Sequence, residues 1–284
     1  MARRRVILVT GATGKQGGAI ARQLLARGHD VRALTRNPDN PAASALASLG
    51  AEVVRGDFAD PASLEDALSG VWGVLSIQNS WESGVEREEA YGKLLARLAR
   101  DAGVSHFVYQ SVASANRRTG IPHFESKFHI EETVRALGFP SFVIIRPVFF
   151  MENFLRMKAA IAGGLLPLGL EPDTRLQMIA VEDIGRIGCL AFERHDAMNG
   201  RAIDIAGDEL TIPEAARALS RVTGRNVIFQ RVPIEQIRAA SEDQAAMLEW
   251  FDAVGYDVDI PAIEREFGSM MRFADWAARQ DWSS

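Results

Sequence analysis

The chain has 284 residues, of which 47% are hydrophobic and 24% are charged, as in ordinary globular proteins. Its formal net charge of −5 argues against a surface for nucleic acid, so we expect no nucleic-acid partner. No apolar run approaches the ~20 residues that span a bilayer, so no membrane partner is expected either.

The first strand and the turn after it carry the strongest signal. The apolar run Val6-Ile7-Leu8-Val9 predicts a buried strand over Val6–Thr10, and an amphipathic helix is predicted over Gln16–Arg27. Between them stands a turn with glycines at every third position. A glycine turn between a strand and a helix is the context in which such a motif binds phosphate, on the first N–H groups of the helix. We therefore expect a dinucleotide pyrophosphate here, with an ordinary βα turn as the alternative. The residues expected to hold it are Gly11, Thr13, Gly14, Lys15, Gln16 and Gly17.

The glycines have separate expected tasks. Gly11 allows the tight turn, Gly14 lets the backbone approach the pyrophosphate, and Gly17 lets the helix pack close to the strand.

The second predicted strand indicates which dinucleotide is preferred. In sites that prefer NAD, an acidic residue at the end of this strand holds the ribose 2′-hydroxyl. Here the strand ends in Thr35-Arg36-Asn37, with no carboxylate. The planar guanidinium of Arg36 can stack on adenine and pair with a 2′-phosphate. This favours NADP(H), while NAD(H) stays possible and Arg36 could instead be a solvated loop residue.

Strands and helices alternate through the first half. Alternating βα units predict a parallel sheet covered on both faces, a Rossmann-type doubly wound α/β fold over residues 1–150. The predicted strands are Val6–Thr10, Val31–Thr35, Glu52–Arg55, Trp72–Ile77, His106–Gln110 and Ser141–Arg146. The predicted helices are Gln16–Arg27, Pro41–Leu49, Pro61–Leu68, Val85–Ala102 and Pro122–Leu137.

The regular alternation of strands and helices ends after the sixth strand. Residues 151–284 are predicted to form a smaller α+β lobe interleaved with the sheet edge. Ligands bind at the carboxyl ends of parallel strands, so we expect this lobe to roof the pocket. Its expected elements are helices over Phe149–Ile161, from Val181 and over Thr211–Val222, strands over Arg201–Gly207 and Asn226–Val232, and mostly helix from Ile234.

Taken together, several motifs resemble those of the NmrA-like family, atypical members of the short-chain dehydrogenase/reductase superfamily. They are the glycine turn, Thr35-Arg36-Asn37-Pro38, Gly56-Asp57, Pro122-His123-Phe124-Glu125-Ser126-Lys127 and Phe150-Met151-Glu152-Asn153-Phe154. The resemblance implies that Asp57 and Phe58 lie at the adenine. It also implies Gln78 and Asn79 along the ribose and pyrophosphate, and Phe150, Met151, Glu152 and Asn153 near the nicotinamide.

Ordinary members of that superfamily use Tyr-x-x-x-Lys, but this chain has His123-x-x-x-Lys127. Residues four apart on a helix share a face, so both are expected in one site. The resemblance implies that Lys127 holds the nicotinamide ribose. An imidazole can exchange a proton in place of the tyrosine, although His123 could equally be a packed helix-start residue. Ser111 matches the substrate-orienting serine, with a capping serine as the alternative. No metal site is expected, because the histidines lack ligand spacing.

The favoured function is an NADP(H)-dependent oxidoreductase that passes hydride to an enone, a quinone or a polycyclic aromatic ketone. An apolar cluster, Phe149, Phe150, Met151, Phe154 and Met157, could pack against such a flat substrate or simply form core. One alternative is a non-catalytic NADP(H) redox sensor that binds a partner protein. Another is a tailoring enzyme of bacterial aromatic polyketide biosynthesis. Either a monomer or a homodimer is compatible with the sequence.

The cellular setting is read from two features of composition. The single cysteine, Cys189, rules out an internal disulfide and, with no secretory signal, indicates the reducing cytoplasm. Arginine far exceeds lysine, and alanine is abundant, which indicates a GC-rich bacterial genome.

Overall fold

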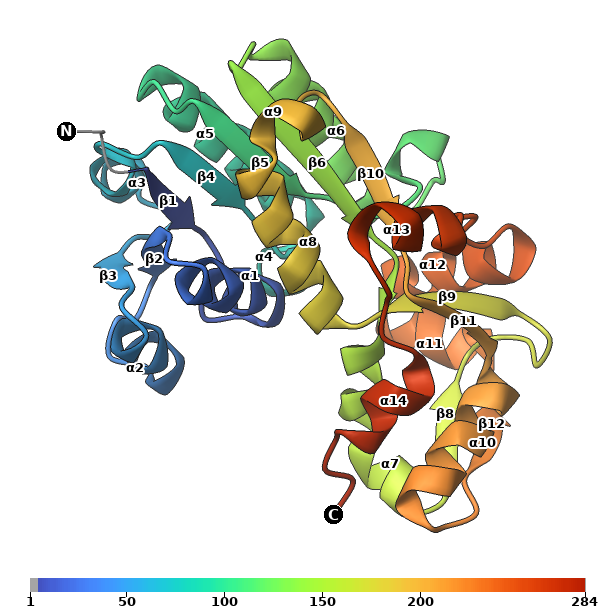
Figure 1. Ribbon diagram of the computed structural model, residues 1–284. Coiled ribbons are helices and arrows are strands. Elements are labelled where there is room, and N and C mark those ends of the chain that lie inside the picture. Colours follow the sequence, from blue (N-terminus) through green and yellow to red (C-terminus); the bar gives the residue numbers. More distant parts are fainter. Residues whose placement is uncertain (1–4, 284) are drawn as a thin grey trace. The chain divides into compact units, whose positions relative to one another are not determined.

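A seven-stranded sheet, in the order β10-β6-β5-β4-β1-β2-β3, organises most of the first half of the chain (Figure 1). The computed structural model describes residues 5–283. Neighbouring strands from β1 to β6 run parallel, with Val9 opposite both Ala33 of β2 and Leu75 of β4. The predicted Rossmann-type sheet is thereby confirmed. Its strands are β1 (Val6–Val9), β2 (Asp30–Thr35), β3 (Glu52–Arg55), β4 (Gly73–Ser76), β5 (His106–Gln110), β6 (Ser141–Pro147) and β10 (Ala202–Ile205).

Helices cover both faces of this sheet. On one face, α3, α5 and α6 enclose a core that includes Leu95, Phe107 and Ile130. On the other, α8 packs tightly on α1, because a Cβ on Gly185 would lie 3.1 Å from Ala19. Every predicted strand and helix up to residue 147 agrees with the structure to within one residue at each end. The helices are α1 (Lys15–Ala26), α2 (Pro41–Ser48), α3 (Pro61–Leu68), α4 (Ser80–Ser83), α5 (Val85–Asp101), α6 (Pro122–Ala136), α8 (Val181–Glu193) and α9 (His195–Met198).

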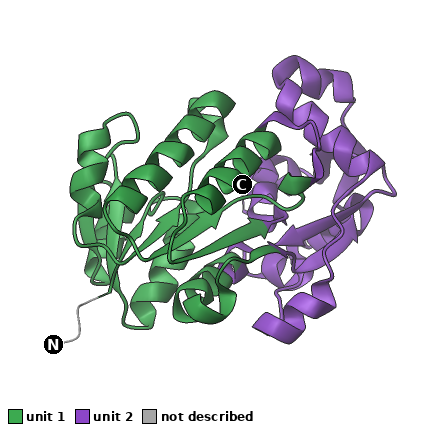
Figure 2. Ribbon diagram, turned by 90° about the horizontal axis from the view of Figure 1, so that it is seen from above, with its two compact units in different colours: residues 1–116, 123–146, 184–203 green, residues 117–122, 147–183, 204–284 purple. Residues whose placement is uncertain are grey.

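The chain divides into two compact units and passes between them several times (Figure 2). Unit 1 holds the residues up to 116 together with 123–146 and 184–203. Unit 2 holds 117–122, 147–183 and the chain from 204 onward. The large sheet and its covering helices belong mainly to unit 1.

Unit 2 contains two small sheets and several helices. The strands are β7 (Phe149–Phe150), β8 (Leu165–Leu168), β9 (Arg175–Ile179), β11 (Asp208–Thr211) and β12 (Ile228–Arg231), paired as β11-β9-β7 and β12-β8. The helices are α7 (Lys158–Ala162), α10 (Ile212–Thr223), α11 (Ile234–Ala240), α12 (Glu242–Ala253), α13 (Ile260–Phe267) and α14 (Phe273–Ala278).

The helix predicted over Phe149–Ile161 is wrong. The segment begins with the two-residue strand β7, continues as a 3₁₀ helix over Met151–Met157 and becomes α-helical only in α7. The physical reason is pairing with a distant strand, since Phe149 lies opposite Met178 of β9. Strands β8, β9 and β11 were not predicted for the same reason: each is short and depends on a partner far along the chain.

Among residues 5–283, no helix combines the length and the apolar character that crossing a bilayer requires.

His106, the first residue of β5, is wholly buried in unit 1. Its Nε2 lies 3.0 Å from the carbonyl oxygen of Ala191, and its Nδ1 lies 2.9 Å from the hydroxyl of Ser141. A carbonyl oxygen only accepts, so Nε2 carries the proton of the neutral ring. Burial, followed by the proximity of His195, lowers the pKa of His106 to about 4.

This burial predicts an acid-sensitive fold. As pH falls from 6.5 towards 4, the unfolded chain protonates His106 while the folded chain does not, which favours unfolding by about 3 kcal/mol at the lower limit. His106→Gln should reduce this loss in urea unfolding measured across that range. His129→Gln, which alters an exposed ring, should leave the loss in place. Identical pH slopes for His106→Gln and the unaltered protein would contradict the assignment.

Candidate functional site

The carboxyl end of β1 is fastened to the carboxyl end of β4 by Thr10. Its hydroxyl oxygen accepts the Ile77 N–H at 2.8 Å and lies 3.2 Å from the carbonyl oxygens of Leu75 and Ile77. The strand order reverses between β1 and β4, because the chain winds outward from β1 in both directions. Such a switch point is where ligands bind in open α/β sheets.

The glycine turn lets the start of α1 lie close to the end of β1. Gly11 has a φ of +60°, a left-handed conformation that glycine adopts without strain. A Cβ on Gly17 would lie 2.6 Å from the carbonyl carbon of Gly11 and 2.8 Å from the carbonyl oxygen of Thr10, so the helix approaches the strand only with glycine there. Gly14 is the N-cap of α1 and donates its N–H to the carbonyl oxygen of Gly11 at 2.9 Å.

This turn fits a phosphate group. Helix α1 has neither a side-chain cap on its first N–H groups nor an acidic residue in its first turn. Exposed first-turn N–H groups and the positive end of the helix dipole stabilise an anion, and no carboxylate there would repel it. Lys15, also in that turn, is exposed.

Arg36 follows β2 and is already paired with an acidic side chain. Its Nη2 lies 2.9 Å from Oε2 of Glu82 in α4, and the two side chains are 67% and 59% exposed. Exposed pairs of this kind contribute about 0–1 kcal/mol, so another anion can replace Glu82 at low cost. Beside it, Asn37 accepts the N–H of Asp39 with its side chain.

The loops after β3 and β4 are held by local contacts. Asp57 accepts the N–H of Ala59 with its carboxylate, and Phe58 stacks on Tyr91 with ring centroids 5.6 Å apart. Gln78 is buried and hydrogen-bonds Ser76 at 3.1 Å, while Asn79 caps α4 by accepting the Trp81 N–H.

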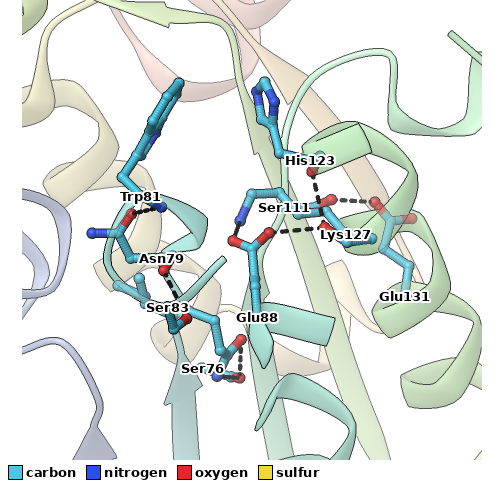
Figure 3. A network of polar contacts seen from close by, with 12 residues as sticks. Ser76, Asn79, Trp81, Ser83, Glu88, Ser111, His123, Lys127 and Glu131 are labelled. Carbon is cyan, nitrogen blue, oxygen red and sulfur yellow. Dashed lines mark hydrogen bonds and ion pairs between the residues drawn. The ribbon is translucent and has the colours of Figure 1, made fainter. Parts of the chain in front are cut away.

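Helix α6 brings His123 and Lys127 to the region next to α4 and α5 (Figure 3). The His123 side chain is buried, and its ring lies 5.8 Å from the ring of Trp81, which is itself 52% exposed. Lys127 donates from Nζ to Oε1 of Glu88 at 2.7 Å, and Ser126 donates to Oε2 of the same carboxylate at 2.8 Å. Glu88, in α5, is completely buried.

Ser111 follows β5 and belongs to a second buried ionic network. Its hydroxyl donates to Oε1 of Glu131 at 2.6 Å, and the guanidinium of Arg146 donates to both oxygens of that carboxylate. Arg146 also donates to Asn116. The proton of Ser111 is thus committed to Glu131, and a role in orienting substrate would use the remaining acceptor capacity of its oxygen.

None of the three tyrosines matches the usual proton-donating position. Tyr109 lies in β5 among core side chains, and burial with the charges of Glu88 and Glu131 raises its pKa well above the ordinary value. Burial likewise raises the pKa of Tyr256, and Tyr91 stacks on Phe58.

The residues predicted at the nicotinamide end lie in unit 2. Met151 is buried, and Phe150 pairs with Ile179 of β9. The carboxylate of Glu152 accepts the N–H of Val181, at the start of α8, and the indole N–H of Trp276 at 3.0 Å. These contacts do not involve a ligand, so the assignment of residues 150–153 to the nicotinamide stays a prediction.

Along the part of the chain that the structure describes, one set of three side chains could in principle hold a metal ion. Ligand atoms of His29, Cys189 and Glu193 lie within 4.8 Å of one another. Arg27 donates to the same Glu193 at 2.6 Å, and burial raises the pKa of the Cys189 thiol to about 12. Both features favour an ion-pair cluster beside a protonated thiol.

The predicted cofactor residues of the glycine turn, Arg36, Asn37, Asp57, Phe58, Gln78 and Asn79 therefore follow β1, β2, β3 and β4, and Ser111 follows β5, all at one edge of the parallel sheet. The sequence did not identify the acidic partners Glu82, Glu88 and Glu131. One available signal was the position of Glu88, which continues the buried stripe of α5 formed by Gly92, Leu95, Ala96 and Ala99. A carboxylate on such a stripe indicates a buried charge with a partner.

Comparison with known proteins shows the family of the chain. The profile of the NmrA-like family matches residues 3–276. The NmrA-like family domain-containing oxidoreductase FrzB of a Cladobotryum species is 32% identical over 255 residues, covering 80% of this chain and 76% of the relative. This relative is fungal, and it gives no support to the predicted bacterial source.

Two solved structures share the fold over nearly the whole chain. Triphenylmethane reductase from Citrobacter sp., complexed with NADP(H), has a TM-score of 0.83 at 22% identity, covering 96% of this chain and 99% of that protein. NmrA, a negative transcriptional regulator in complex with NAD, has a TM-score of 0.82 at 20% identity, covering 99% of both chains. On the match to the family profile over most of its length, the chain belongs to the NmrA-like family.

Proposed function

We propose that the chain is an NADP(H)-dependent oxidoreductase acting on an enone, a quinone or a polycyclic aromatic ketone. The observation that carries this proposal is the start of α1, which has no side-chain cap and no acidic residue in its first turn and where Gly17 packs against Gly11. A relative named as an oxidoreductase and a fold neighbour crystallised with NADP(H) support it.

In this proposal, different residues of the chain bind different parts of the cofactor. The glycine turn binds the pyrophosphate and Arg36 binds the 2′-phosphate, while Asp57 and Phe58 flank the adenine. Gln78 and Asn79 line the ribose and pyrophosphate, and Lys127 donates to the nicotinamide ribose. We assign residues 150–153 to the nicotinamide end.

The bound nicotinamide supplies hydride to the substrate. His123, four residues before Lys127, is assigned to give a proton to the substrate oxygen, and Ser111 to orient that oxygen. We assign the substrate to unit 2, because residues 150–153, which we assign to the nicotinamide end, lie in it.

Turnover tests the enzyme directly. The purified protein should consume NADPH with at least one member of a panel of quinones, enones and polycyclic aromatic ketones. Lys127→Gln should lower kcat/KM about 10–100-fold, as expected when a charged hydrogen bond to the ligand is lost. Lys93→Gln is the matched control, because Lys93 also pairs with a glutamate of α5, Glu89.

Three results would separate the alternatives. No NADPH consumption across a broad panel would contradict the oxidoreductase. Product mass distinguishes simple reduction, a gain of two hydrogens, from the oxygen gain of a polyketide-tailoring reaction. Cofactor binding without turnover would favour a non-catalytic sensor, the second candidate function.

The burial of Tyr109 in β5 supports that second candidate, a non-catalytic NADP(H) sensor. A sensor needs no proton donor, and NmrA, a fold neighbour, is named a negative transcriptional regulator. It should bind NADP⁺ and NADPH with different affinities and capture a protein partner in one state only. Equal affinities in calorimetry, with no partner captured, would exclude it.

The Arg36–Glu82 pair predicts how cofactor preference can be changed. Glu82→Gln removes the competitor for the Arg36 guanidinium, so the Kd for NADP⁺ should fall about two- to fivefold, the equivalent of an exposed ion pair. The Kd for NAD⁺ should not change, since NAD⁺ lacks the 2′-phosphate. Arg36→Ala should abolish the preference for NADP⁺.

The control for net charge is Glu52→Gln, which removes an exposed carboxylate from the other end of the neighbouring strand, β3. Weaker NADP⁺ binding by Glu82→Gln in calorimetry would mean that Glu82 orients Arg36 for the phosphate and does not compete with it.

A further inference from the structure

We propose that Glu88 is a positioning residue, which fixes the ammonium of Lys127 in the direction that the cofactor ribose requires. This inference rests on the proposed function, because it assigns Lys127 to the cofactor. Glu88 itself would touch neither cofactor nor substrate and would act through Lys127.

The first step concerns the state of the carboxylate. Glu88 is 0% exposed, and a buried charge is tolerated only when it is paired and hydrogen-bonded. Both of its oxygens are satisfied by consecutive residues of α6: Oε1 by Lys127 at 2.7 Å and Oε2 by Ser126 at 2.8 Å. A carboxylate held at both oxygens is a fixed point on which a flexible lysine can be anchored.

The second step concerns what remains of the ammonium. The side chain of Lys127 is 14% exposed, so it lies at the border between core and solvent. An ammonium has three N–H donors, and Glu88 takes one of them. Two donors remain for the neighbouring hydroxyls of a ribose. Because a lysine side chain carries about 2 kcal/mol of rotamer entropy, fixing it in advance strengthens ligand binding.

The third step concerns helix packing. Glu88 and Gly92 are one turn apart on α5, and Ser126 and Ile130 are one turn apart on α6. A Cβ on Gly92 would lie 2.8 Å from Cγ1 of Ile130, so the helices touch closely at that level. The contact one turn earlier is the one between Glu88 and Ser126. The spacing of the helices therefore sets where the carboxylate meets Lys127.

The alternative is that Glu88 only clamps α5 to α6. The two roles differ in their dependence on Lys127. A positioning residue loses its effect on the cofactor once Lys127 is replaced, whereas a clamp affects the fold in either background.

The experiment is a double-mutant cycle of Glu88→Gln and Lys127→Gln. NADP⁺ binding is measured by calorimetry, and the melting temperature of each variant is measured alongside. Each single variant should weaken NADP⁺ binding about tenfold, the scale of one hydrogen bond to a charged group. The double variant should bind no more weakly than Lys127→Gln alone. Glu89→Gln is the matched control: Glu89 is the next residue of α5 and also reaches α6, through His129, and its replacement should change the Kd less than about twofold.

Glu88→Asp covers the case in which Glu88→Gln does not fold. It keeps the charge but withdraws the carboxylate by one methylene, so it should weaken NADP⁺ binding in the Lys127 background and have no effect on Lys127→Gln. Additive losses in the cycle, or unchanged binding by Glu88→Gln, would overturn the positioning role while leaving the proposed function intact. If the unaltered protein does not bind NADP⁺, the proposed function fails first.

Discussion

The close approach of α1 to β1 is the constraint on which the rest of the site depends. Only glycine at position 17 lets the helix start so near the carbonyls of Thr10 and Gly11. The same approach sets the level of α1 on the sheet, and α8 then packs on α1 through Gly185 and Gly188. A larger residue at position 17 would therefore move the glycine turn and the helix layer together. The candidate site and this face of the core both require glycine at position 17.

The opposite face of the sheet is shaped by two buried carboxylates. Glu88 and Glu131 are both fully buried, yet each has a basic partner, Lys127 and Arg146 respectively. Removing one member of such a pair typically costs about 3–5 kcal/mol, because the other charge is left without compensation. Each pair also holds a residue of the candidate site, Lys127 directly and Ser111 through Glu131. The polar network beneath the site is thus part of the fold and restricts which side chains can be replaced independently.

The first half of the fold could be predicted because its information is local. Apolar strands, amphipathic helices and glycine or proline punctuation mark each βα unit, and the parallel sheet follows from their alternation. The segment after residue 147 could not be predicted in this way. Phe149 and Phe150 look like helix core in sequence, and their strand exists only because β9 lies beside them.

The residues of the candidate site also differ in whether local sequence could predict them. The loops that end β1 to β5 follow from the topology, so their residues could be named in advance. Their partners could not: Arg36 meets Glu82 and Lys127 meets Glu88 across 46 and 39 residues of chain. Acidic residues on helices usually face solvent, and only the buried stripe of α5 distinguishes Glu88 from its neighbour Glu89.

In the proposed complex, the two cationic residues would meet the cofactor with different rigidity. Arg36 lies in an exposed ion pair that exchanges one anion for another at little cost. Lys127 pairs with the carboxylate of Glu88, which is fully buried and is therefore not readily exchanged for another anion. Hydride transfer requires precise placement of the nicotinamide and tolerates looser placement of the adenosine. A preorganised cation at the reacting end and an adaptable one at the other end would match that requirement, since rigidity is useful only where geometry limits the rate.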